Sequence, residues 1–109
     1  MAKYLIEASY SQAGLKALIK DGGTGRKKVV EAATKALGGR VESMYFAFGT
    51  SDVYAIVEAP DNVTAAAFAL AVGGTGIAAH LKTIVLLTAD EVDQAAKKSA
   101  AAGYKAPGA

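Results

Sequence analysis

The chain has 109 residues, with 12 Lys and Arg against 10 Asp and Glu, one His and no Cys. This length suits a single domain, and because a core this small is often completed by self-association, we expect a homo-oligomer. The net charge of +2 is too low to indicate a nucleic acid or an anionic membrane as partner, and the lack of Cys excludes disulfides and thiol chemistry.

The first third of the chain reads as a strand followed by two helices. Residues 3–10 alternate in the pattern of a half-buried strand, and they lack the long apolar run of a signal segment or membrane span. We therefore expect a cytoplasmic protein. Ser11 can cap a short helix that ends at Gly22 and Gly23, and Thr24 can cap a second helix.

The rest of the chain predicts strand, strand, helix, strand and a last helix. Residues 40–48 and 53–59 are rich in β-forming residues and flank residues 49–52, which suit a hairpin turn. Asp61 starts an Ala-rich helix, and residues 80–87 form a fourth strand.

Thr88 and Glu91 form a capping box that opens the last helix, which we expect to run through residue 98. We assign residues 1–98 to a single domain and residues 99–109 to a flexible C-terminal tail. The order of elements indicates an α+β, ferredoxin-like βαββαβ fold, with an antiparallel four-stranded sheet and helices on one face. A second copy of the chain is expected to cover the other face.

Four stretches of sequence resemble the GYD domain family over about nine tenths of the chain: KYLIEASY, YFAFG, DVYAIVEAPDNVTAAAFALAVG and KTIVLLTADEVDQAAKK. The motif that names the family, Gly-Tyr-Asp, falls at the hairpin turn, where this chain keeps Gly49 and Asp52 but has no tyrosine. The resemblance implies a dimeric α+β barrel. It implies no single activity, because barrels of this kind include monooxygenases, isomerases, haem enzymes and ligand-sensing domains.

The hairpin assigns residues to the two faces of the sheet. A four-residue turn would pair Phe48 with Val53, Phe46 with Ala55 and Met44 with Val57, which places these side chains on the face that the helices cover. The same face is expected to carry the more apolar positions of the first and last strands: Tyr4, Ile6, Ala8, Tyr10, Leu81, Thr83, Val85 and Leu87.

The opposite, open face then carries an amphipathic set of side chains: Glu7, Ser43, Tyr45, Tyr54, Glu58, His80 and Lys82, among Leu5, Ile56, Ile84 and Leu86. These residues can fill a subunit interface, in which tyrosines bury ring area and charges pair at the rim. Alternatively, they can line a ligand pocket, where His80 titrates near neutrality and Tyr45 or Tyr54 orients a small molecule. Neither a catalytic triad nor a metal-ligand spacing is present, so we expect no metal and no cofactor.

Residues 22–28, GGTGRKK, combine glycines with a basic helix start, where an anion can bind. They lack the spacing of a phosphate-binding loop, and a solvated first turn is the simpler interpretation. An RNA-recognition role is not indicated either, because the third strand carries a single aromatic residue, Tyr54.

The leading hypothesis is a homo-oligomeric, GYD-type module for small-molecule binding or assembly. One alternative is a cofactor-independent enzyme, of the isomerase or monooxygenase type, that acts in a pocket between sheet and helices. A second alternative is a structural scaffold that forms larger rings or filaments. The residues that we expect to bind a ligand are His80, Tyr45, Tyr54, Glu7, Lys82 and Glu58.

Overall fold

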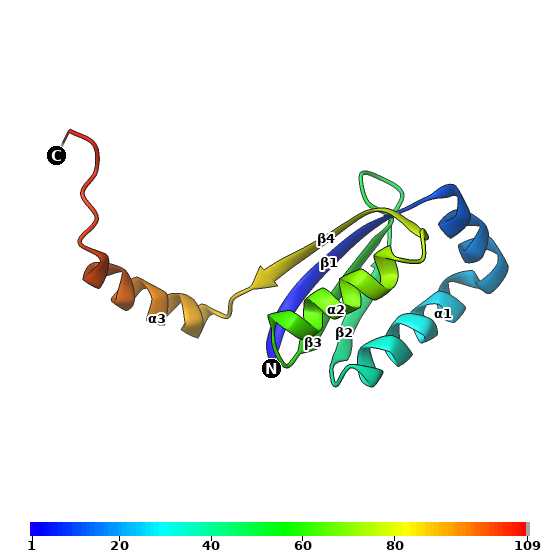
Figure 1. The fold of residues 1–109 in the computed structure, drawn as a ribbon, viewed down its shortest axis with the longest axis horizontal. Coiled ribbons are helices and arrows are strands. Elements are labelled where there is room, and N and C mark those ends of the chain that lie inside the picture. The colour runs from blue at the N-terminus through cyan, green and yellow to red at the C-terminus, as the bar shows by residue number, and fades with distance from the viewer. Residues whose placement is uncertain (109) are drawn as a thin grey trace.

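Four antiparallel strands form one sheet in the order β2-β3-β1-β4 in the computed structural model, which describes residues 1–108 (Figure 1). Residue 109, the end of the expected tail, lies outside the described residues. The α+β, ferredoxin-like character expected from the element order is confirmed. The elements are β1 (Ala2–Tyr10), α1 (Gln12–Ala36), β2 (Arg40–Phe46), β3 (Val53–Ala59), α2 (Asn62–Gly73), β4 (Ala78–Leu86), α3 (Ala89–Ser99) and the 3-10 helix η1 (Ala100–Ala102).

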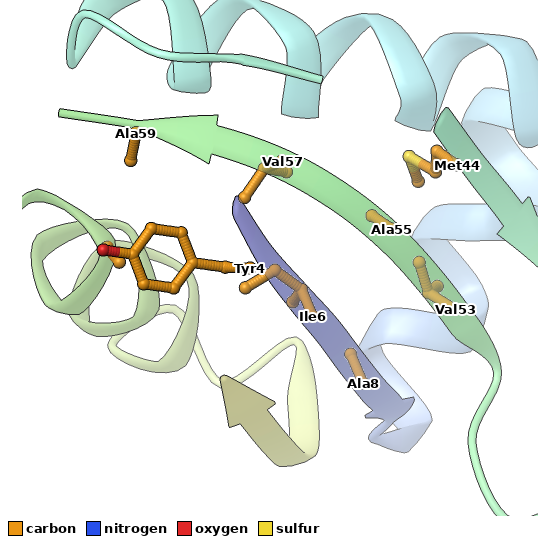
Figure 2. Packing of buried hydrophobic residues seen from close by; sticks show 9 residues of the cluster. Tyr4, Ile6, Ala8, Met44, Val53, Ala55, Val57 and Ala59 are labelled. Carbon is orange, nitrogen blue, oxygen red and sulfur yellow. The ribbon is translucent and has the colours of Figure 1, made fainter. Parts of the chain in front are cut away.

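Helices α1 and α2 cover one face of the sheet, and the core lies between them and the strands. The alternation in β1 decides which side chains enter it, since Tyr4, Ile6 and Ala8 are all buried. They pack with a set of residues from the other strands and α2: Met44, Val53, Ala55, Val57, Ala59 and Ala65. In Figure 2 Tyr4 reaches from β1 toward α2, and its hydroxyl donates a hydrogen bond of 2.6 Å to Asn62 Oδ1.

The first helix is continuous except for one kink. Ser11 caps it as expected, because its side-chain oxygen accepts a hydrogen bond from the backbone N–H of Gly14. The chain bends at Gly22, whose φ of 72° lies in a region that glycine adopts without strain. The expected cap at Thr24 is wrong: Gly22 itself carries the non-helical angles, so the second half of the helix starts ahead of Thr24.

Strand β2 ends at Phe46, two residues earlier than expected, so Phe46 and not Phe48 pairs with Val53. Asp52 explains the difference, because its backbone N–H donates to Ala8 O and its carboxylate accepts from the N–H of Tyr10, both at 2.8 Å. These bonds to β1 widen the connection to residues 47–52 and leave Phe48 90 % exposed.

The register between β2 and β3 differs from the expectation in two ways. Met44 pairs with Ala55 and not with Val57, a shift of two residues that leaves Met44 and Phe46 on their expected face. An irregularity between Val41 and Ser43 then adds one residue to β2, so that Val41 is the partner of Val57.

Helix α3 projects from the end of β4 and lies on neither face of the sheet (Figure 1). Thr88 and Glu91 form the expected capping box at its start, yet none of its residues is buried. Among the helices within residues 1–108, none combines the length and the apolar character that crossing a membrane requires.

Candidate functional site

The open face of the sheet carries three parallel rows of side chains, because residues that pair across antiparallel strands point to the same face. We name them the polar row (Tyr45, Tyr54, Glu7 and Lys82), the central row (Ser43, Ile56, Leu5 and Ile84) and the charged row (Arg40, Glu58, Lys3 and Leu86). Each row takes one residue from β2, β3, β1 and β4 in that order.

The polar row brings four of the six expected site residues together. Tyr45 pairs with Tyr54 across β2 and β3, Tyr54 pairs with Glu7, and Glu7 pairs with Lys82 on β4. His80 lies on the same face of β4, two residues before Lys82 and opposite Ser9. Tyr45 is 72 % exposed and His80 and Lys82 are exposed as well, so a hydroxyl, an imidazole and an amine are available at this end of the face, beside the partly exposed carboxylate of Glu7.

The sixth expected residue, Glu58, lies in a different place from the other five. It belongs to the charged row, about 13 Å along β3 from Tyr54. Its carboxylate is paired with Arg40 and lies 4.0 Å from Lys3 Nζ, and Lys3 is also 3.0 Å from Glu42. Glu58 is therefore held in a local ion-pair network and does not reach the polar row.

The central row separates the two outer rows and is mostly apolar. Leu5 and Ile56 are partly buried by their neighbours, whereas Ile84 is 40 % exposed. An apolar strip between two polar margins is the arrangement found where one protein surface packs on another.

A hollow of about 330 Å³ lies at the polar end of the face, and Glu7, Ser9, His80 and Lys82 line it together with the hairpin loop. Ser9 Oγ holds that loop in place by donating a hydrogen bond of 2.8 Å to Thr50 O. The hollow offers an anionic, a cationic and an imidazole group to a small ligand. Within residues 1–108, no three His, Cys, Asp or Glu side chains gather as a metal site would require.

Two residues of chemical interest lie on the other side of the sheet: Tyr10, which was expected on that face as a core residue, and Arg26, which was not expected there. Arg26 and Tyr10 line an apolar cavity between the helices and the strands. A signal for Arg26 exists in the sequence, because it precedes Val29, Val30 and Ala33 by three, four and seven residues. That spacing places Arg26 on the apolar stripe of its helix and not in a solvated first turn.

The environment of Tyr10 changes its acidity. Burial raises the pKa of its hydroxyl above the ordinary value, while the positive charge of Arg26 and a hydrogen bond from its side chain act in the opposite direction, and Asp52 raises the pKa slightly further. Tyr10 is consequently a neutral hydrogen-bond donor at physiological pH.

Comparison of the chain with models of protein families finds a match over most of its length. The model of the GYD domain matches residues 4–96, which include most of β1 and the whole of α1, β2, β3, α2 and β4. Neither the curated proteins nor the solved structures gave a match.

Proposed function

The chain belongs to the GYD domain family, and we propose that two copies of it associate through the open faces of their sheets to form a homo-oligomeric assembly module. The observation that carries the proposal is the central row, an apolar strip with polar margins on a sheet face that neither α1 nor α2 covers. A second copy supplies the same strip, so packing face to face removes both from water.

The charges at the margins suit contact between two identical surfaces. The polar row pairs Glu7 with Lys82 across the sheet, and the charged row contains Arg40, Glu58 and Lys3. Because each margin carries both signs, a two-fold axis can bring acidic groups of one copy near basic groups of the other. A surface of one sign would repel itself.

Helix α3 gives independent support for association. It has eleven residues, and isolated helices shorter than about 12–15 residues are marginal in water. Val92 is 50 % exposed, and its spacing to Ala89 and Ala96 puts all three on one side of the helix. We propose that this side packs on the neighbouring copy, which would supply the tertiary contact that α3 lacks within its own chain.

The test is the mass of the protein in solution, measured by light scattering after size-exclusion chromatography. Wild-type protein should have at least twice the single-chain mass of 11.0 kDa, and Ile84→Glu should shift it to the monomer, because a carboxylate in the central row would be buried unpaired. Val63→Glu is the matched control, since Val63 is 79 % exposed on α2 and should keep the wild-type mass.

Two results decide between association and its alternatives. A wild-type mass of 11.0 kDa at high micromolar concentration would refute association. Masses well above the dimer that persist in Ile84→Glu would instead favour the scaffold alternative, with contacts made outside the sheet.

A second function, small-molecule binding at the open face, is supported by the hollow beside His80. There Glu7 and Lys82 would hold the polar groups of a ligand, and His80 could move a proton if the protein is a cofactor-independent enzyme. His80→Ala separates the roles, because His80 lies at the rim of the face and not in the central row. Loss of ligand retention with unchanged mass would favour binding, whereas loss of mass would assign His80 to the interface.

A further inference from the structure

We propose that the cavity between the sheet and the two helices binds a small organic carboxylate with an apolar body, and that Arg26 holds the carboxylate. The cavity has a volume of about 100 Å³. It lies on the face of the sheet opposite to the proposed interface, so the proposal does not depend on association.

The walls of the cavity are apolar and come from every layer of the fold. The strands contribute Ile6, Ala8, Val53 and Leu81, and the helices contribute Val30 and Phe68. Engineered apolar cavities of about 150 Å³ hold a benzene molecule. The cavity has about two thirds of that volume, so it suits a short branched chain, or a single ring that extends into the neighbouring groove, and it leaves no room inside for a nucleotide or a sugar phosphate.

Arg26 is the one basic side chain among the cavity-lining residues that the structure describes, and its hydrogen bonding is incomplete. Its side chain is 14 % exposed, and Nη1 lies 3.3 Å from Oδ2 of the exposed Asp21. Its Nε is buried and has no hydrogen-bond partner within residues 1–108. A buried guanidinium donor without an acceptor is unfavourable, and a carboxylate is the acceptor whose charge and planar shape fit it best.

Tyr10 lies beside Arg26 in the same cavity and adds a neutral O–H donor. The cavity thus offers one cation and one hydroxyl at one end of an apolar space. This favours a monoanion over inorganic phosphate, because phosphate would keep oxygens that the apolar walls cannot satisfy. It also favours a carboxylate over the corresponding alcohol, which carries no charge to pair with Arg26.

A groove between α1 and α2 adjoins the cavity and is the route by which we propose that a ligand enters. Its volume is about 430 Å³, and it shares Arg26, Val29, Phe68, Val72 and Ile77 with the cavity wall. Arg26 therefore borders both spaces. A ligand that enters along the groove would first meet the charge of Arg26, and its apolar part would then move into the cavity between the helices and the sheet.

The experiment titrates the full chain with sodium benzoate, benzyl alcohol and inorganic phosphate, with calorimetry and the NMR signal of Arg26 Nε as readouts. We expect benzoate to shift that signal and to bind at least about tenfold more tightly than benzyl alcohol or phosphate. Arg26→Met should abolish the preference for benzoate and leave the mass of the oligomer unchanged. Lys27→Met is the matched control, because Lys27 is an exposed neighbour of equal charge and its loss should leave benzoate binding intact.

Ala33→Leu provides a second route if Arg26→Met does not fold. Ala33 lines the cavity, and a larger side chain there should fill it and exclude benzoate while Arg26 stays in place. The proposal is overturned if the Arg26 Nε signal does not move, if benzyl alcohol or phosphate binds as tightly as benzoate, or if Arg26→Met binds benzoate like the wild type. Each of these results would leave the proposed dimer untouched, since that is judged by mass alone.

Discussion

At the scale of single residues, Tyr4 has the clearest energetic role. Its side chain is 1 % exposed, and its hydroxyl bonds to Asn62 at the start of α2. Tyr4→Phe keeps the ring and removes the bond, so we expect a loss of about 1 kcal/mol in the free energy of unfolding, measured by urea denaturation. Tyr104→Phe, at a position that is 83 % exposed, should change nothing. An unchanged unfolding midpoint for Tyr4→Phe would show that the hydrogen bond contributes no net stability.

Asp61 makes stability depend on pH. Its carboxylate accepts hydrogen bonds from the hydroxyl and then from the backbone N–H of Thr64, which lower its pKa below the ordinary value of 3.8. A lowered pKa contributes stability that is present above the ordinary pKa and is lost as the pH falls through the folded-state value. The stability of the wild type should therefore decline below about pH 4 more steeply than that of Asp61→Asn, which retains a capping side chain but does not titrate.

Thermal unfolding followed by circular dichroism between pH 2 and pH 7 measures this difference. Asp93→Asn is the control, because Asp93 lies in the middle of α3, away from a helix start. Parallel pH curves for the wild type and Asp61→Asn would contradict the assignment.

The alternation of apolar and polar residues in the strands predicts some features of single residues and not others. Alternation predicts the face of each side chain, and Tyr4, Ile6 and Ala8 are buried as expected. It does not predict the register, because a slip of two residues preserves the faces. The register between β2 and β3 depends on the long-range hydrogen bonds between Asp52 and β1, and with these bonds Phe48 lies in the loop and not in the expected core.

At the scale of elements, local signals predicted the helix starts at Ser11 and Thr88 but not the direction of the Arg26 side chain. Ser11 and Thr88 cap their helices because each offers an oxygen to a nearby N–H, a contact within a few residues. Arg26 was assigned to a solvated turn because its neighbours Lys27 and Lys28 are basic. Its direction follows from the apolar stripe of α1 and from the packing of that helix on the sheet, which depends on distant residues.

Helix α3 has no buried residue within its own chain. If it packs on a neighbouring copy, its amide hydrogens should exchange slowly in the wild type and much faster in the monomeric variant Ile84→Glu. The physical reason is that its capping box stabilises only the first turn, while no residue of the helix is buried within its own chain. Hydrogen exchange followed by mass spectrometry measures this difference, with the amides of β1 as the internal control. Equal exchange of α3 in both proteins would place its stabilising contact elsewhere.

At the scale of the whole molecule, the sheet is a layer with one face covered by its own helices and one face that neither α1 nor α2 covers. The molecule measures 58 × 32 × 22 Å, and α3 extends it along its longest axis (Figure 1). Element order alone predicted an antiparallel four-stranded layer with its helices on one face. The separation of Glu58 from the polar row depends on the register and on the distance along β3, which element order does not contain.

If association completes the fold, stability must depend on protein concentration. Each tenfold rise in concentration should add about 1.4 kcal/mol per dimer, because mass action favours the associated native state over unfolded chains. Calorimetry over a hundredfold range should therefore show the midpoint of the wild type rising with concentration. The midpoint of Ile84→Glu should stay constant, because one chain unfolds alone, and Val63→Glu should follow the wild type. A constant midpoint for the wild type at concentrations that span dissociation would mean that the open face is stable in water without a partner.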